Sequence, residues 1–363
     1  MDERSNVQGK TVRVAALTSG MEVPSARFRV RQHVQTLKNH NIMVSEHCPA
    51  VNQHARVPGK LSGIRSRYLL PVAGAQVMLN ILCRIPGAIG TYKADAVWLE
   101  RSFVPGMEPL VNLTKSPRVL DVDDSVWLMT PLGEKSARLL ARSVDAVIAG
   151  NGFLADWYSN YCKNIYIVPT AIDCRRFLPK PNGSDNGNDS FVIGWTGTSY
   201  NFKYLKLIEK PLARFLENHR QARLLIVAER KPMLESIPQS QFIFEAWTEP
   251  TEADILHKID VGIMPLADDD WGRGKCGFKM LQYMATGIPV VVSNVGMNKE
   301  ILEKGKCGFG VADDDEWYQC IETLFSSPRL RADLGKSGRI IVEGNYSMDV
   351  VSGKLAEVFH GVA

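Results

Sequence analysis

Short runs of β-forming apolar residues alternate with helix-length amphipathic segments along most of the chain, and this alternation constrains the fold more than any other feature. Apolar runs of roughly four to seven residues with this spacing are typical of buried parallel strands joined by crossover helices. We expect strands in ten segments, which begin at Val12, Asp95, Arg118, Asp145, Ile165, Phe191, Arg223, Phe242, Asp260 and Pro289. The sequence therefore predicts an α/β fold with parallel sheets.

The longest run of turn-forming residues divides the chain of 363 residues into two halves of similar size. This run, residues 178–190, has no apolar periodicity, which is typical of an interdomain linker. We predict an N-terminal domain over 1–177, a C-terminal domain over 191–345, and a last helix over 346–363 that packs on the N-terminal domain. Two doubly wound domains would place the carboxyl ends of both sheets at a cleft, where ligands bind.

Composition and missing motifs exclude several classes of protein. A net charge of +4 is too small for a protein that wraps nucleic acid, and we expect no nucleic-acid partner. The first strand is followed by TSGMEVPSARFR, which lacks the GxGxxG pattern of dinucleotide-binding domains. The seven cysteines form no CxxC pair, which argues against a zinc site or disulfide framework.

The most apolar stretch, residues 69–89, is interrupted by prolines and polar residues, so we expect no membrane-spanning helix. The polar first ten residues do not resemble a signal peptide. Together with the reducing compartment that the cysteines favour, these features predict a cytoplasmic protein.

The segment 260–293 carries the densest pattern of ligand-binding residues. A strand leads into an acidic loop, then through glycines into a helix from about Gly277 to Thr286. Backbone N–H groups at a helix start bind anions, and Lys275 and Lys279 beside them favour a diphosphate ligand. The competing interpretation is that these lysines are merely solvated.

A second anion site is predicted at the start of the C-terminal half. The strand over 191–195 runs into Gly197, Thr198 and Ser199, and Lys203 follows at the start of the next helix. A glycine turn with hydroxyl groups can donate several hydrogen bonds to a phosphate. Ordinary turn chemistry is the alternative.

The chain resembles the family 4 glycosyltransferases of the GT-B fold in several segments. In the C-terminal half these are GWTGTSYNFKYL, DVGIMPL and above all GKCGFKMLQYMATGIPVVVSNVGMN, and in the N-terminal half SARFRVRQHVQTLKNHNI, LDVDD and VPTAID. The resemblance implies two Rossmann-like domains facing across a cleft. It also implies sugar transfer from a nucleoside-diphosphate sugar, usually with retention of configuration, with no metal and no cofactor besides this co-substrate.

Family members commonly carry two glutamates eight positions apart, and Gly274 and Gln282 occupy the matching positions here. Gln282 can still hydrogen-bond a ribose hydroxyl, and we expect Asp268, Asp269 or Asp270 to contact the donor sugar in place of Gly274. The resulting donor-binding set is Gly197, Thr198, Ser199, Asp269, Asp270, Lys275, Gly277, Phe278 and Gln282.

Without a metal, protein cations must stabilise the charge that develops on the leaving diphosphate. We assign this catalytic role to Lys203 and Lys279. Asp123 and Asp124 match a His-Asp pair that often follows an N-terminal strand, and we interpret Asp123 as catalytic and Asp124 as an acceptor contact. Capping of the next helix is the alternative for Asp124. Asp121 and Asp123 also form a DxD pattern, for which we do not expect a metal.

Arginines near two strand ends are candidates for the acceptor side. Arg27 opens the first helix at the cleft end of the first sheet, and Arg101 follows the strand at 95–99. We interpret the neighbouring Arg29 and Arg31 as solvated surface.

The segment 54–67 carries Arg56, Lys60, Arg65 and Arg67 without an acidic residue, and an apolar stretch over 68–83 follows it. A basic patch beside apolar residues favours an anionic membrane surface. The competing interpretation is a core helix with a solvated start. Membrane docking would make a lipid-linked acceptor plausible.

These observations predict a glycosyltransferase that acts on a glycan or lipid-linked acceptor in surface polysaccharide or glycolipid assembly. Two alternatives stay open. The substitutions at Gly274 and Gln282 are compatible with a GT-B-shaped binding protein that has lost turnover, and a nucleotide-sugar epimerase would need the donor alone.

Overall fold

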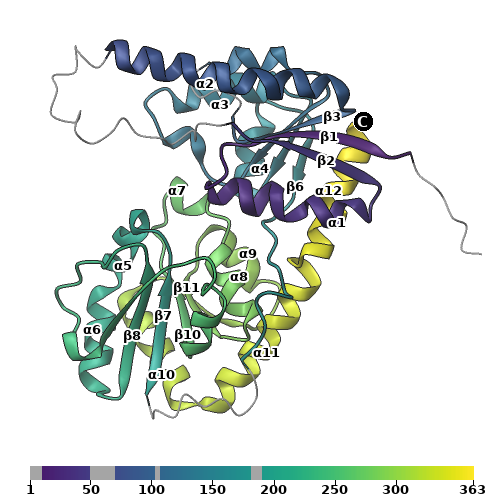
Figure 1. Cartoon of the computed structure of the whole chain (residues 1–363). Helices are drawn as coiled ribbons and strands as arrows, with labels where there is room; N and C mark the ends of the chain where they lie inside the picture. The colour runs from purple at the N-terminus through teal and green to yellow at the C-terminus, as the bar shows by residue number, and fades with distance from the viewer. Residues whose placement is uncertain (1–9, 50–69, 103–106, 181–189) are drawn as a thin grey trace, which may run out of the picture. The chain divides into compact units, whose positions relative to one another are not determined.

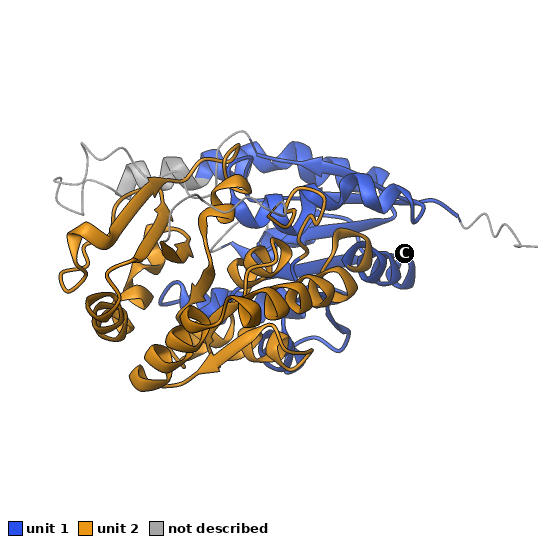
Figure 2. Ribbon diagram, turned by 90° about the horizontal axis from the view of Figure 1, so that it is seen from below, with its two compact units in different colours: residues 1–170, 351–363 blue, residues 171–350 orange. Residues whose placement is uncertain are grey.

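The computed structural model describes residues 10–49, 70–102, 107–180 and 190–363, and for residues 70–77 it describes the backbone only. The chain forms two compact units (Figure 2). Unit 1 consists of Met1–Thr170 with Val351–Ala363, and unit 2 of Ala171–Val350. Each unit contains one six-stranded sheet in which all paired strands are parallel, so the predicted α/β class is confirmed.

The sheet of unit 1 has the strand order β2-β1-β3-β4-β5-β6. Strand order reverses between β1 and β3, where Leu17 pairs with Leu99, and ligands of doubly wound sheets bind outside such a switch point. The strands are β1 (Val12–Leu17), β2 (Ile42–His47), β3 (Ala96–Glu100), β4 (Arg118–Val122), β5 (Ala146–Ala149) and β6 (Ile165–Ile167).

Helices cover both faces of this sheet. Apolar residues of α2 (Leu70–Gly90), α3 (Gly133–Arg142) and α4 (Gly152–Ser159) form one core cluster with the strands. Helix α12 (Met348–Val362) packs on the other face, where the rings of Trp98 and Phe359 lie 5.0 Å apart. The first helical segment comprises a π-helical turn at Ala26–Val30 and α1 (Val34–Lys38), whose Leu37 is fully buried (Figure 1).

The sheet of unit 2 has the order β12-β11-β10-β7-β8-β9, with its switch point between β7 and β10. The strands are β7 (Phe191–Thr196), β8 (Ala222–Ala228), β9 (Phe242–Ala246), β10 (Val261–Met264), β11 (Val290–Ser293) and β12 (Gly308–Val311). Alternate side chains of β7, β8, β10 and β11 enter two separate core clusters, as expected for a sheet that is buried on both faces.

One cluster of unit 2 joins the sheet to α8 (Phe278–Ala285), α9 (Gly296–Leu302) and α11 (Pro328–Asn345). The other joins it to α5 (Phe202–Leu207), α6 (Glu209–Asn218) and α10 (Asp314–Ser326), and Figure 1 shows these two groups on opposite faces of the sheet.

A close contact fixes α8 against the sheet. The ring of Tyr283 lies against Gly262 of β10, where any Cβ atom would collide with it. The hydroxyl of Tyr283 accepts a hydrogen bond of 2.9 Å from the N–H group of Thr196, at the end of β7. As a result, the start of α8 is held at the carboxyl ends of β7 and β10.

The units divide between Thr170 and Ala171, so the predicted domain end at 177 lies inside unit 2. The reason is that Ile172 and Phe177 are buried in the core of unit 2. Residues 181–189 of the predicted linker lie outside the described residues. Within the described residues, no helix combines the length and the apolarity that crossing a bilayer requires.

Candidate functional site

The loops that follow β7 and β10 in unit 2 carry most of the predicted donor-binding residues. Gly197 and the turn at Thr198–Ser199 follow β7, while the short helix α7 (Asp270–Arg273) and then α8 follow β10. Because β7 and β10 are neighbours, both loops lie at the switch point of the sheet.

Lys279 and Gly197 are in direct contact. A Cβ atom on Gly197 would lie 2.4 Å from Cε of Lys279, so the lysine side chain crosses the backbone where only glycine leaves room. The ammonium group lies 5.6 Å from the ring centroid of Trp195. Thus the structure brings together two predicted site residues that are far apart in sequence.

Gly277 is the N-cap of α8 and adopts the left-handed backbone conformation, with φ of +66°. Residues other than glycine rarely adopt this backbone conformation, and a glycine cap offers no side chain to the amides of the first turn. The positive end of the helix dipole and the nearby Lys279 ammonium together favour an anion there.

Two further predicted lysines, Lys203 and Lys275, lie at the same end of the sheet, each beside an aromatic ring. Lys203 Nζ lies 5.4 Å from the ring centroid of Tyr200, and Lys275 Nζ lies 4.5 Å from that of Trp271. The two rings contact each other edge to face, with centroids 6.3 Å apart. Lys203 and Lys275 therefore belong to one cluster that joins the loops after β7 and β10.

The turn after β7 is only partly the anion site that we predicted. The N–H group of Ser199 donates to both oxygens of Glu229, at 2.8 and 3.0 Å. Although burial opposes it, hydrogen bonding from Ser199 lowers the pKa of Glu229. The amide of Ser199 is consequently engaged by a carboxylate rather than open to a phosphate.

The acidic loop before α8 is largely engaged in local contacts. Asp269 is the N-cap of α7 and accepts a hydrogen bond of 2.6 Å from Gly272 N, and Asp268 pairs with Arg273 at 2.7 Å. The side chain of Asp270 is exposed. The predicted sugar contact of Asp269 thus competes with helix capping, and Asp270 is the more accessible carboxylate.

Gln282, the predicted ribose contact, is buried. Lys275 precedes α8, and Gln282 is only 5% exposed because its side chain points into the unit. The Gln282 amide donates to Glu252 at 3.0 Å, and Glu252 also pairs with Arg176 at 3.0 Å. The sequence analysis missed Glu252, which lies in a loop without any motif.

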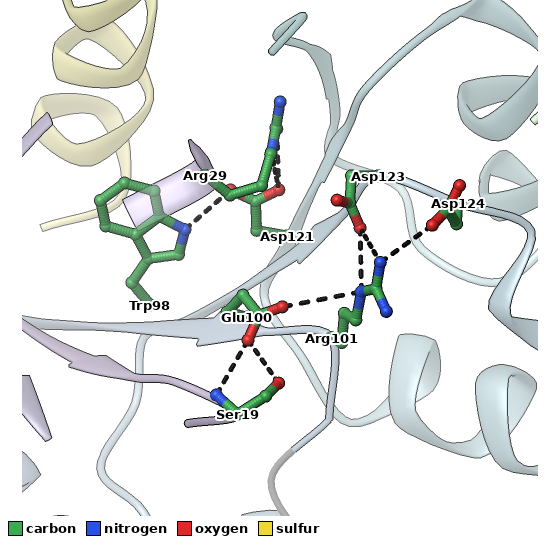
Figure 3. Close-up of polar contacts among 8 residues, drawn as sticks. All are labelled: Ser19, Arg29, Trp98, Glu100, Arg101, Asp121, Asp123 and Asp124. Carbon is green, nitrogen blue, oxygen red and sulfur yellow. Dashed lines mark hydrogen bonds and ion pairs between the residues drawn. The ribbon is translucent and has the colours of Figure 1, made fainter. Parts of the chain in front are cut away.

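At the carboxyl ends of the strands of unit 1, Arg101 binds the two predicted aspartates, Asp123 and Asp124. Its guanidinium group lies 2.9 Å from both Asp123 and Asp124 and 3.6 Å from Glu100 (Figure 3). Burial opposes the charge of Arg101, but these carboxylates outweigh it and raise its pKa. Arg101 has a φ of +64°, a conformation that costs a non-glycine residue of the order of 1–3 kcal/mol and that clusters at functional sites.

A buried ion pair lies beside this cluster. Arg29, only 3% exposed, donates to Asp121 at 2.8 Å, and the indole N–H of Trp98 donates to the same carboxylate at 2.9 Å (Figure 3). Burial raises the pKa of Asp121 to about 6, although Arg29 and the hydrogen bonds oppose the shift. The expectation that Arg29 is solvated was wrong.

Asp121 and Asp123 of the DxD pattern thus contact different arginines. Within the described residues, no group of three or more histidine, cysteine or acidic side chains could hold a metal ion. Glu100 accepts hydrogen bonds from both the N–H and the hydroxyl of Ser19, so the strand ends of β1 and β3 are tied together.

The other predicted arginines of the first helical segment differ in exposure and contacts. Arg27 is half-buried with its guanidinium carbon 4.7 Å from the ring centroid of Phe28. Arg31 makes two hydrogen bonds to Glu46, of 2.6 and 3.0 Å, so it is not merely solvated.

The two parallel sheets, each covered by helices on both faces, define an α/β protein of the GT-B type. Residues 190–327 match the model of the family Glycosyl transferases group 1. The recognition of this family from the sequence is therefore confirmed, and the matched residues lie within unit 2 and include Gly197, Gly277 and Lys279.

Two curated relatives illustrate the similarity. The chain is 35% identical over 79 residues to spore coat protein SA of Bacillus subtilis, which is 21% of each protein. It is 23% identical over 184 residues to the capsular polysaccharide biosynthesis glycosyltransferase CapM of Staphylococcus aureus, 48% of this chain and 47% of CapM. The chain thus spans a fifth to a half of the length of these curated relatives.

Among solved structures, HepE of Anabaena in complex with UDP-glucose matches with a TM-score of 0.70 and 13% identity, over 97% of this chain and all of that one. A match at this identity shows a common fold, and it confirms the predicted GT-B fold class over both units.

Proposed function

We propose that this protein is a glycosyltransferase. It would move a sugar from a nucleoside-diphosphate sugar to a glycan or lipid-linked acceptor in surface polysaccharide or glycolipid assembly, with retention of configuration and without a bound metal. The observation that carries the proposal is the Lys279 side chain, which lies over Gly197 beside the start of α8, where the N-cap is Gly277.

The chemistry follows from the charge of the leaving group. When the glycosidic bond to the nucleoside diphosphate breaks, negative charge develops on the phosphate oxygens, and preorganised cations and N–H groups stabilise it. The ammonium of Lys279 and the first-turn amides of α8 would supply this stabilisation. Lys203 and Lys275, in the same ring-linked cluster, would strengthen the positive potential around the donor.

Two relatives guide the choice of substrates to test. HepE was solved with UDP-glucose, and CapM is a capsular polysaccharide glycosyltransferase. UDP-sugars are therefore the first donors to test. The carboxylates of Asp123 and Asp124, held by Arg101, would accept hydrogen bonds from acceptor hydroxyls on unit 1.

The test has a binding step and a turnover step. Nucleoside diphosphates and UDP-sugars should raise the melting temperature of the full chain, since a ligand that binds only the native state stabilises it. Donor hydrolysis without acceptor should then release free nucleoside diphosphate, more slowly in Lys279→Met. Binding without release would support the inactive binding protein, and conversion of the donor sugar without release would support the epimerase.

We also propose a peripheral association with the inner face of an anionic membrane. Helix α2 exposes large apolar side chains at Met78, Leu79, Leu82, Ile85 and Ile89. The basic segment 54–67, which precedes α2 in the sequence, lies outside the described residues. Basic residues next to an exposed apolar helix face favour anionic lipid.

Vesicle flotation tests this association. The wild-type chain should float with vesicles that contain anionic lipid, and Leu82→Glu should weaken flotation strongly. Ile340→Glu, on an exposed position of α11 in unit 2, is the matched control. Equal flotation with purely zwitterionic vesicles, or equal losses in both variants, would contradict the proposal.

A further inference from the structure

A pocket of about 220 Å³ lies in unit 1 at the carboxyl ends of β1 and β2. Its walls are Thr18, Glu46, His47 and Cys48 on the strand side, and Cys83 and Arg84 on the side of α2. With a water taking about 30 Å³, the pocket is large enough for a phosphate group and part of what it is attached to.

The packing of α2 bounds this pocket at one end. At Gly90, a Cβ atom would lie 2.5 Å from the ring of His47, and at Gly87 one would lie 3.2 Å from both His47 and Leu17. The helix therefore touches β1 and β2 at these glycines. One turn earlier, Cys83 and Arg84 line the pocket instead.

Glu46 and Arg84 are the charged side chains named in the lining of the pocket. The charge of Glu46 is met by the two hydrogen bonds from Arg31, and the hydroxyl of Thr18 donates to the same carboxylate at 2.8 Å. Arg84 is only 6% exposed, and burial lowers its pKa because the charged form is partly desolvated. An anion in the pocket would favour the charged guanidinium group.

We infer that this pocket binds a phosphate group of the acceptor, with the guanidinium of Arg84 as its principal ligand. A guanidinium matches phosphate geometry through two parallel N–H donors. Only the assignment of this phosphate to the acceptor rests on the proposed function. It narrows that acceptor to a phosphate-bearing compound such as a lipid-linked or phosphorylated glycan.

Cysteine alkylation tests the pocket directly, since Cys48 and Cys83 line it and Cys174 and Cys320, both half-buried in unit 2, serve as internal controls. The full chain is treated with a small maleimide in the presence of inorganic phosphate, glucose 1-phosphate or glucose, and each thiol is followed by mass spectrometry. Both phosphates should slow the alkylation of Cys48 and Cys83 at least fivefold.

Arg84→Met should remove this protection while the melting temperature stays the same or rises, because a desolvated charge is lost. Arg84→Lys, which keeps the charge without the bidentate geometry, should protect weakly and serves if the first variant does not fold. Equal protection by glucose, protection that persists in Arg84→Met, or no protection by either phosphate would overturn the inference.

The response of the melting temperature to nucleoside diphosphates is recorded in the same samples. Protection by phosphate without that response would leave the pocket as an anion site and count against the proposed donor function. A melting-temperature response to nucleoside diphosphates without protection by phosphate would support the proposed donor function and overturn the phosphate site in the pocket.

Discussion

Replacing Lys279 by methionine, and separately Gly197 by alanine, tests the contact at the centre of the proposed donor site. Lys279→Met removes the charge but retains most of the side chain that packs over Gly197. Gly197→Ala retains the charge but puts a methyl group where the lysine side chain lies. The backbone of Gly197 is not in the left-handed region, so alanine introduces no backbone strain there.

The expected magnitudes follow from the contact distances. The new Cβ atom would lie 2.4 Å from Lys279 Cε and 2.7 Å from the buried ring of Trp195, whereas ordinary contacts begin near 3.4 Å, so the lysine side chain must move by about 1 Å and the indole must also shift. A displacement of this size can cost on the order of a hundredfold in rate. Loss of one preorganised donor costs about 100- to 1000-fold in kcat, so we expect about a hundredfold for Lys279→Met.

The assay is transfer or donor hydrolysis under saturating donor, with the melting temperature of each variant measured in parallel. If Gly197 acts through Lys279, then adding Gly197→Ala to Lys279→Met should cause little further loss, because the double-mutant cycle isolates their coupling. Additive losses would mean that Gly197 acts independently of the lysine. Near-normal turnover of Lys279→Met would remove this lysine from the mechanism.

Burial lowers the pKa of His33 to about 3, whereas the same side chain in the unfolded chain binds a proton near pH 6.5. The free energy of unfolding should therefore fall by about 1.4 kcal/mol for each pH unit below 6.5. In urea unfolding at pH 7.5 and 5.0, His33→Gln should lose less stability between the two pH values than the wild type does. Arg29→Met should cost about 3–5 kcal/mol of unfolding free energy because it leaves the Asp121 carboxylate buried without its guanidinium, and adding Asp121→Asn should recover part of it. Gly335→Ala should lower the free energy of unfolding by about 1–3 kcal/mol, since its Cβ would collide with the backbone oxygen of Gly287. The new Cβ in Gly338→Ala would meet only side chains, the nearest at 3.3 Å, so this variant should lose less stability. Equal losses in calorimetry would refute this reasoning.

The central strands of both sheets were predictable from the sequence. Each of the ten apolar segments contains a strand. Eight of these are central strands, which are buried on both faces and must be apolar at nearly every position, and the other two, β6 and β9, are edge strands. The two strands that were missed, β2 and β12, are edge strands. The first has alternating exposed positions, and the second contains two glycines, so neither produces a continuous apolar run.

The start of α8 was also predictable, since the expected helix from Gly277 to Thr286 differs from the observed one by a residue at each end. The tertiary contacts of two glutamates were not predictable from the sequence. Glu229 on Ser199 and Glu252 on Gln282 join segments of different loops, and nothing in the local sequence of either glutamate indicates its partner.

The burial of Arg29 had a signal in the sequence that was not used. Ala26, Arg29 and His33 are spaced by three and four residues, which places them on one face of a helix, and all three are buried. Polar residues on an apolar face can be recognised by this spacing. Their partners, here Asp121 and Ser352, become known only from the fold.

The placement of α12 has a consequence for the order in which the protein matures during synthesis. Phe359 completes the aromatic contact with Trp98, yet all of unit 2 is translated between them. At about 5–20 residues per second, ribosomes would need roughly 10 to 40 s to make that intervening stretch. During this interval the nascent unit 1 would expose the apolar surface that α12 later covers, which makes it a natural client for chaperones.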